Sequence, residues 1–406
     1  MCVECELRFI FCIHTGASNQ EDEVKPTIQE YSAEELKKEI ENKKKKYERA
    51  LKEGGVALCW KLFEEEKYEW KYQKLNIAIV GRSGIGKSSF VNAIMKKWTG
   101  ECPAKVGLTE TTMVCTGYAH HNNPNIILWD LPGVGTEKFP QASYLEKVNA
   151  DLFDVFIIMT ESRFTEHDTW LGKVMQKRNI PVIFVRTKIH IDVKNSKHDH
   201  PEKDARTALD VVKADMIAKS SFVKGLGVFL IDSHKSDRYE FSDLEKCITE
   251  KLGETKGQAL VFSVSRMSKD VVEQKVAELR KLVWSAGTSS YVFGALSMMF
   301  REVAVVESYA LFFVKQLGLD VQSLEQRAID PEKLNSVKRD VEKVIADIPS
   351  IIKCPVLLRI CQALPLIGGS ISADIVNNSL KEVLNRLETI ALEAINVFTD
   401  AADYCN

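Results

Sequence analysis

Apolar and polar positions change their spacing twice along the chain. Between about residues 73 and 253, six short apolar runs alternate with stretches whose apolar residues recur every three or four positions. This alternation is typical of a mostly parallel sheet with helices on both faces. The predicted strands are 75–80, 112–119, 125–130, 153–160, 181–186 and 227–232, and the predicted helices include 88–97, 143–150, 166–178, 203–218 and 241–253.

On both sides of this region the apolar spacing is that of helices alone. The capping-box pattern Ser32-Ala-Glu-Glu35 starts a helix, which Gly54-Gly55 interrupts before a second helix. After residue 253 the strand-like runs disappear. The expected parts are a disordered or loosely ordered tail (1–31), N-terminal helices (32–72), an α/β domain (73–253) and a C-terminal helical domain (254–406), which the N-terminal helices join.

The composition is that of a globular protein, with 45% hydrophobic and 28% charged residues among 406. This length favours two domains. The formal net charge of −2 gives no reason to expect a nucleic-acid partner. Ten cysteines at irregular spacing suit reduced thiols, so we expect a cytoplasmic protein.

No uninterrupted apolar stretch is long enough to span a bilayer. The most apolar segment, residues 353–372, is broken by Lys353, Arg359 and two prolines. A buried core helix accounts for it better than an amphipathic segment that touches a membrane. Any association with intracellular membranes is therefore expected to be peripheral.

A glycine-rich segment follows the first predicted strand and opens the next predicted helix. Residues 81–88, Gly-Arg-Ser-Gly-Ile-Gly-Lys-Ser, match the pattern of a phosphate-binding loop in its required context. Its glycines can adopt positive φ, so that backbone N–H groups converge on phosphate oxygens. Lys87 can reach the β- and γ-phosphates, and the Ser88 hydroxyl can ligate Mg²⁺. The residues expected at the nucleotide phosphates are Gly81, Arg82, Ser83, Gly84, Ile85, Gly86, Lys87, Ser88 and Ser89.

A second motif ends the third predicted strand. In Asp130-Leu-Pro-Gly133 the carboxylate can hold a Mg²⁺-bound water, and the glycine N–H can meet the γ-phosphate. The segment before the second strand is the predicted first switch, where a threonine binds Mg²⁺ when the γ-phosphate is present. Thr109, Thr111 and Thr112 all qualify on chemistry.

A third motif follows the fifth predicted strand, where GTP-binding proteins place [NT]-K-x-D to read guanine. Thr187 and Lys188 fit, but His190 stands where the aspartate is expected, and Asp192 lies two residues later. A neutral imidazole has one N–H and one acceptor, so it cannot accept from both guanine N1–H and N2–H₂ as a carboxylate does. Ser233 and Lys235, after the sixth strand, are candidates for a contact at the guanine O6. Base specificity stays open at this point.

These motifs resemble those of the immunity-related, interferon-inducible GTPases of the GKS type. The resemblance covers about residues 33–400 and rests on 81–89, 129–135, 156–158, 184–188, 228–230 and 281–284. It implies an α/β plus all-α fold, in which a Ras-like P-loop G domain with a mostly parallel six-stranded sheet is inserted in a helical domain formed by both chain ends. It also implies GTP hydrolysis to GDP and phosphate, stimulated by nucleotide-dependent self-assembly, in cell-autonomous defence at intracellular membranes.

Residue by residue, the resemblance makes Lys87 the phosphate lysine, and Ser88, Thr112 and Asp130 the Mg²⁺ site. It makes Glu110 an acidic residue that acts in activation across the dimer. Val134 stands where small Ras-like proteins place a water-orienting glutamine, so slow turnover is expected until a second molecule completes the site.

Two alternatives to an assembling GTPase remain. A nucleotide-binding scaffold, or pseudo-GTPase, would keep the phosphate loop without hydrolysis, and His190 is its best support. An ATPase or kinase would also use the loop, but Thr187-Lys188 argues against it.

Overall fold

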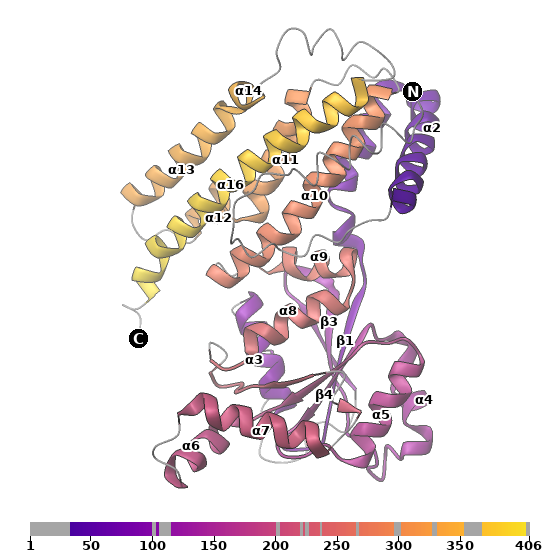
Figure 1. Cartoon of the computed structure of the whole chain (residues 1–406), viewed down its shortest axis with the longest axis vertical. Helices are drawn as coiled ribbons and strands as arrows, with labels where there is room; N and C mark the ends of the chain where they lie inside the picture. The colour runs from indigo at the N-terminus through magenta and orange to yellow at the C-terminus, as the bar shows by residue number, and fades with distance from the viewer. Residues whose placement is uncertain are drawn as a thin grey trace. The chain divides into compact units, whose positions relative to one another are not determined.

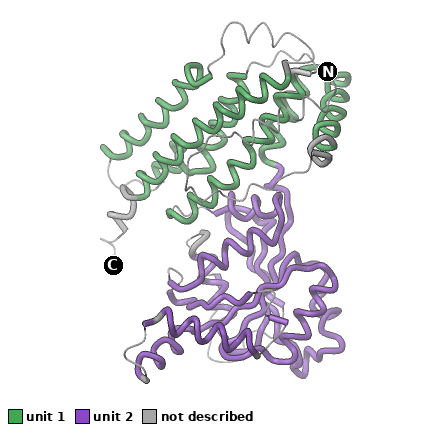
Figure 2. Tube along the Cα trace, viewed as in Figure 1, with its two compact units in different colours: residues 1–68, 267–406 green, residues 69–266 purple. Residues whose placement is uncertain are grey.

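The computed structural model of this chain contains a six-stranded sheet with helices around it and a separate set of long helices (Figure 1). It describes residues 33–99, 103–104, 115–199, 204–219, 222–223, 227–235, 238–264, 268–295, 302–326, 331–352 and 368–402. The chain divides into two compact units, one formed by residues 69–266 and the other by residues 1–68 and 267–406 (Figure 2). The expected fold class, an α/β domain inserted in a helical domain made by both ends, is confirmed.

The sheet has the order β2-β3-β1-β4-β5-β6, in which β2 is antiparallel to β3 and the other neighbours are parallel. Parallel strands end at the same edge of a sheet, where ligands of such folds bind. Within the described residues the second strand begins later than predicted, and residues 112–114 lie outside them. The strands are β1 (Leu75–Val80), β2 (Thr116–His120), β3 (Asn123–Asp130), β4 (Val155–Thr160), β5 (Val182–Arg186) and β6 (Val228–Leu230).

Helices connect the strands and cover the sheet. One of them, α6, was not predicted, because residues 189–199 are mostly polar and show little apolar periodicity. It starts directly after the third motif and therefore determines how that motif ends. The helices of this unit are α3 (Lys87–Thr99), α4 (Tyr144–Val148), α5 (Glu166–Lys177), α6 (Ile189–Asp199), α7 (Ala205–Lys219), α8 (Phe241–Lys251) and α9 (Glu254–Ser263).

The boundaries of the α/β unit differ from those expected. The 3-10 helix η1 (Glu69–Tyr72) and α9 belong to the same unit as the sheet. The Trp70 ring packs edge-on against Phe262, with centroids 5.5 Å apart, and Asn123 Nδ2 donates to Ser263 Oγ at 3.1 Å. The helical period of residues 254–263 indicates a helix but not the unit it packs on.

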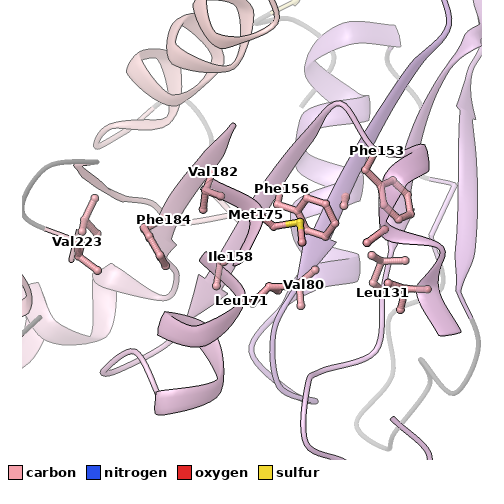
Figure 3. Packing of buried hydrophobic residues seen from close by; sticks show 14 of the residues in the cluster. Val80, Leu131, Phe153, Phe156, Ile158, Leu171, Met175, Val182, Phe184 and Val223 are labelled. Carbon is pink, nitrogen blue, oxygen red and sulfur yellow. The ribbon is translucent and has the colours of Figure 1, made fainter. Parts of the chain in front are cut away.

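Aromatic and aliphatic side chains fill the layer between β4, β5 and the neighbouring helix α5 (Figure 3). Phe156, Phe184 and Leu171 are fully buried. The Phe184 ring lies edge-on to Phe164 at 4.7 Å between centroids, and Phe153 lies edge-on to Phe156 at 5.4 Å. Close packing of this kind resists displacement of the strands, so the strand ends form a rigid frame.

The regular secondary structure of the second unit, among the residues that the structure describes, consists of helices. Its N-terminal helix α2 is one helix with a kink, because Gly55 has φ 65° and ψ −161° inside it. The rings of Tyr47 and Phe63 contact Phe293 at 5.0 and 5.5 Å between centroids, which ties α2 to the C-terminal half. The helices are α2 (Ala33–Glu66), α10 (Lys269–Ala295), α11 (Glu302–Gln316), α12 (Val321–Glu325), α13 (Pro331–Ala346), α14 (Ile348–Ile351) and α16 (Gly368–Ala402).

Two predictions concern membranes: that no segment spans a bilayer, and that residues 353–372 form a buried core helix. Among the helices of the described residues, none is both long and apolar enough to cross a bilayer. Most of the apolar segment 353–372 lies outside the described residues, which resume at residue 368. The choice between a core helix and a membrane-touching segment therefore stays a prediction.

His120 is a buried titratable group at the end of β2. Its side chain is 1% exposed, and Nδ1 accepts a hydrogen bond from the Asn122 backbone N–H at 3.2 Å. Burial, and to a smaller extent the neighbouring His121, lowers the pKa of His120 to about 4. A proton on Nδ1 would both charge a desolvated ring and remove its acceptor.

This burial predicts a loss of stability in mild acid. Between pH 6.5 and pH 4 the unfolded chain binds a proton at residue 120 that the folded chain does not, so stability falls as pH falls through this window. From pH 7 to pH 5 the contribution of His120 is about 2 kcal/mol of unfolding free energy. Urea unfolding of the full chain at both pH values measures it.

His120→Gln removes the titrating ring and is expected to reduce the acid loss by that amount. His121→Gln, on the exposed neighbouring residue, serves as the matched control and should keep most of the wild-type pH dependence, because His121 makes only the smaller contribution to the lowered pKa of His120. An unchanged pH dependence in His120→Gln would contradict the assignment.

Candidate functional site

The loop between β1 and α3 uses its three glycines in two different ways. Gly84 and Gly86 have φ of 83° and 97°, where side chains other than glycine are strained. Gly81 does not have a positive φ, contrary to what its place in the motif suggested. A Cβ on Gly81 would lie 2.2 Å from Ile85 Cδ1 and 2.6 Å from the Met159 carbonyl oxygen. Gly81 therefore permits close packing of the loop on β4, whereas the other two shape its turn.

Lys87 is the first residue of α3 and is buried beneath this loop. Its ammonium lies 3.4 Å from the Arg82 carbonyl oxygen and 3.9 Å from Asp130 Oδ1. Burial lowers the pKa of Lys87, and the Asp130 carboxylate partly offsets this effect. A helix N-terminus and a desolvated ammonium at one point make a strongly favourable place for an anion.

Ser88 and Asp130 meet although they come from different motifs. Ser88 Oγ donates a hydrogen bond to Asp130 Oδ2 at 2.8 Å, and Asp130 is 1% exposed at the end of β3. Gly133 follows, so close to the loop that a Cβ there would lie 3.0 Å from the Gly81 carbonyl oxygen. A hydroxyl and a carboxylate in contact are hard oxygen donors of the kind that Mg²⁺ prefers. The donor set therefore fits that ion.

The other residues expected at the metal and at the switch cannot be placed. Thr109, Glu110, Thr111 and Thr112 lie in residues 105–114, outside those that the structure describes. Their roles stay predictions.

A cavity of about 680 Å³ opens beside the loop. Arg82, Ser83 and Lys87 from the loop side and Gly133 and Val134 after β3 contribute to its lining. The sequence predicts Arg82, Ser83, Lys87 and Gly133 at the phosphates. It places Val134 where small Ras-like proteins have a glutamine that orients water. The cavity thus brings the first two motifs together around one space.

The third motif is attached to the phosphate loop by two side chains. The Thr187 hydroxyl donates to the Ile85 carbonyl oxygen at 2.8 Å. Lys188, which has φ of 57°, donates from Nζ to the Gly84 carbonyl oxygen at 2.9 Å and pairs with Glu161 at 2.5 Å. Because these contacts span about a hundred positions of sequence, only the sheet can have brought the motifs together.

Asp192 has a partner that makes it a poor substitute for the expected aspartate. Asp192 stands in the first turn of α6, and both of its carboxylate oxygens accept from Arg186 Nη2 at 2.8 Å. Arg186 also donates from Nη1 to the Ser162 carbonyl oxygen at 2.8 Å. The structure therefore gives the Asp192 carboxylate a structural ion pair, which sequence reasoning did not foresee.

A residue that sequence reasoning missed lies beside His190. Asp232, after β6, is 2% exposed, and its Oδ2 lies 3.0 Å from His190 Nδ1. Its Oδ1 accepts from the His234 backbone N–H at 3.0 Å. The adjacent Ser233 Oγ is buried with no hydrogen-bond partner among the described residues. The available signal was a carboxylate at the end of a strand that was already predicted to border the site.

Known proteins match most of this chain in sequence. A model of the family described as interferon-inducible GTPase matches residues 40–355. Mouse interferon-gamma-inducible GTPase 10 is 28% identical over 316 residues, which cover 76% of this chain and 73% of the relative. Mouse T-cell-specific guanine nucleotide triphosphate-binding protein 2 is 30% identical over 288 residues, or 69% of each chain.

Among solved structures, an oligomerised bacterial dynamin pair covers 93% of this chain and 80% of that chain. Its sequence identity is 13% and its TM-score 0.35, so this likeness is too small to carry an argument. The family match needs no such support, since it spans most of the chain and includes all three motifs. By its sequence, this chain belongs to the interferon-inducible GTPase family.

Proposed function

We propose that this protein binds GTP and GDP with Mg²⁺ and hydrolyses GTP to GDP and phosphate. The observation that carries the proposal is the meeting of Ser88 Oγ with Asp130 Oδ2 at 2.8 Å, directly beside the buried Lys87 ammonium. A hydroxyl, a carboxylate and an ammonium at the N-terminus of a helix are the groups that a Mg²⁺-bound triphosphate requires.

In this proposal each part of the loop has a distinct task. Backbone N–H groups of residues 81–89 donate to phosphate oxygens, and the positive φ of Gly84 and Gly86 aims them inward. Lys87 neutralises charge on the β- and γ-phosphates, and Gly133 donates its N–H to the γ-phosphate. Ser88 and Asp130 would hold Mg²⁺, which supplies positive charge to the phosphate oxygens when it is bound.

The base side of the proposed site is formed by Thr187, Lys188 and Ser233. Thr187 and Lys188 attach their own segment to the phosphate loop. This attachment would hold the sites for the purine and for the phosphates of the nucleotide at a fixed separation. The buried, unpartnered Ser233 hydroxyl supports a polar contact to the purine at this end.

We extend the proposal to activation by self-assembly, with Glu110 and Thr112 completing the site. Its support is the valine at position 134, which offers no polar group to orient an attacking water. A second molecule would supply the polar group that orients the attacking water. A role in cell-autonomous defence, with peripheral association of a cytoplasmic protein with intracellular membranes, is part of the same proposal.

Replacing the buried lysine tests the proposal. Lys87→Ala is expected to weaken Mg²⁺-GDP binding at least about tenfold, because a charge-assisted hydrogen bond contributes roughly 1.5–3 kcal/mol. Phosphate release from GTP should fall to background. Calorimetric titration and a phosphate-release assay on the full chain measure the two effects.

Lys96→Ala is the matched control, since Lys96 is an exposed lysine of the same helix. Equal GDP binding by Lys87→Ala and wild type would refute the proposed phosphate site. Intact GDP binding by the wild type without any phosphate release would favour the nucleotide-binding scaffold instead.

Self-assembly makes a separate prediction about concentration. If a second molecule completes the site, the GTPase rate per molecule should rise with protein concentration in the presence of GTP and Mg²⁺. Turnover measured over a range of protein concentrations, together with light scattering, tests this. A constant rate per molecule would remove the assembly step and leave nucleotide binding untouched.

A further inference from the structure

The position that reads guanine in GTP-binding proteins holds a histidine in this chain, and that histidine is paired. His190 Nδ1 lies 3.0 Å from Asp232 Oδ2, which is an ion-pair distance, although the two atoms form no hydrogen bond in the structure. The Asp232 side chain is 3% exposed, whereas that of His190 is 39% exposed. The carboxylate is therefore shielded from solvent, whereas the imidazole is partly exposed to it.

The segments that carry His190 and Asp232 are joined by backbone hydrogen bonds, which hold the two side chains near each other. The Ile189 N–H donates to the Ile231 carbonyl oxygen at 3.3 Å, and the Ile231 N–H donates to the Arg186 carbonyl oxygen at 2.9 Å. His190 stands in the first turn of α6, next to Lys188, whose Nζ contacts Gly84. The imidazole therefore belongs to the segment that Lys188 attaches to the phosphate loop.

The carboxylate determines which ring nitrogen carries the proton. An ionised aspartate only accepts hydrogen bonds, so a lone pair on Nδ1 at this distance would be repelled and an N–H attracted. In the neutral imidazole the proton therefore stays on Nδ1, and Nε2 keeps its lone pair. Nδ1 is buried and the side chain as a whole is 39% exposed, so we infer that Nε2 is the nitrogen left to accept a hydrogen bond from a ligand.

We propose that His190 Nε2, oriented and kept as an acceptor by Asp232, reads the purine N1–H in place of the missing aspartate. This inference rests on the proposed function, because it assigns the base contact of the same nucleotide site. His190 is the specificity-determining residue, and Asp232 is a positioning residue that acts through it. Asp192 is the weaker candidate for this contact, since Arg186 already donates to both of its oxygens.

One acceptor cannot do all that two oxygens do. A carboxylate accepts from both N1–H and the 2-amino group of guanine, whereas Nε2 has a single lone pair. Hypoxanthine keeps N1–H and lacks the amino group, so it should satisfy this site as well as guanine does. Adenine presents an acceptor at N1, which Nε2 would repel. The expected specificity is for 6-oxopurines, with little discrimination between guanine and hypoxanthine.

Calorimetric titration of the full chain with GDP, IDP and ADP in Mg²⁺ tests the specificity. Wild type is expected to bind GDP and IDP within about threefold of each other and ADP at least about tenfold more weakly, the size of one lost or repulsive buried hydrogen bond. His190→Ala should weaken GDP and IDP by a common factor. His234→Ala, on an exposed histidine that contacts Asp232 only through its backbone N–H, should leave all three affinities unchanged.

A swapped variant tests the chemistry in the opposite direction. His190→Asp combined with Asp232→Ser restores the usual carboxylate and removes the second one, because two adjacent carboxylates would repel each other. This double variant should bind GDP at least about tenfold more tightly than IDP, since the 2-amino group regains an acceptor.

The positioning role of Asp232 has its own readout. Histidine ¹⁵N chemical shifts distinguish a proton on Nδ1 from one on Nε2, and wild type should show His190 with the proton on Nδ1. In Asp232→Asn an amide group can donate to Nδ1, so the signal should shift toward the other tautomer while GDP binding falls about threefold or more. A purely structural aspartate would change the affinity without changing the tautomer.

Three outcomes would overturn the inference. GDP binding at least about tenfold tighter than IDP in wild type would show that another group accepts from the 2-amino group. ADP binding as tight as GDP, or a wild-type His190 with its proton on Nε2, would also contradict it. In all three cases the proposed GTPase function would survive, whereas failure of wild type to bind any of the three nucleotides would reject both.

Discussion

The parallel pairing of β1 with β3 and β4 is the constraint on which the site depends. In this register Ile79 faces Asp130, and the Leu131 N–H donates to the Ile79 carbonyl oxygen at 2.9 Å. The phosphate loop and the aspartate motif therefore leave the sheet side by side. A shift of the register by one residue would turn Asp130 to the other face of the sheet and separate it from Ser88.

Desolvated charge is the second feature that the sheet makes possible. Lys87 and Asp130 are almost completely buried, and Lys87 Nζ lies 3.9 Å from Asp130 Oδ1. The Ser88 hydroxyl donates to the other oxygen of the same carboxylate. In a low-dielectric setting such groups interact strongly with one another and with an incoming anion. The packing of Phe156 and Phe184 behind the strand ends keeps this arrangement from relaxing.

Much of the site could be predicted because its motifs are local. The turn of residues 81–88 and the aspartate at the end of β3 depend on a few neighbouring residues, whose types and spacing determine the backbone that they form. Three predictions needed revision for the opposite reason. Gly81 is required by the close approach of the Met159 carbonyl oxygen on β4, Asp192 is engaged by Arg186, and α9 packs with the sheet.

The alternation of strands and helices, the phosphate loop and the family could all be read from the amino-acid sequence, since each depends on residue types at short, regular spacing. The carboxylate that faces His190 could be identified only from the folded chain. Asp192 is two residues away along the chain, whereas Asp232 reaches the imidazole because β5 and β6 pair in parallel and end at the same edge. Residues far apart along the chain can meet at the ends of neighbouring strands. The base end of this site is formed by such residues.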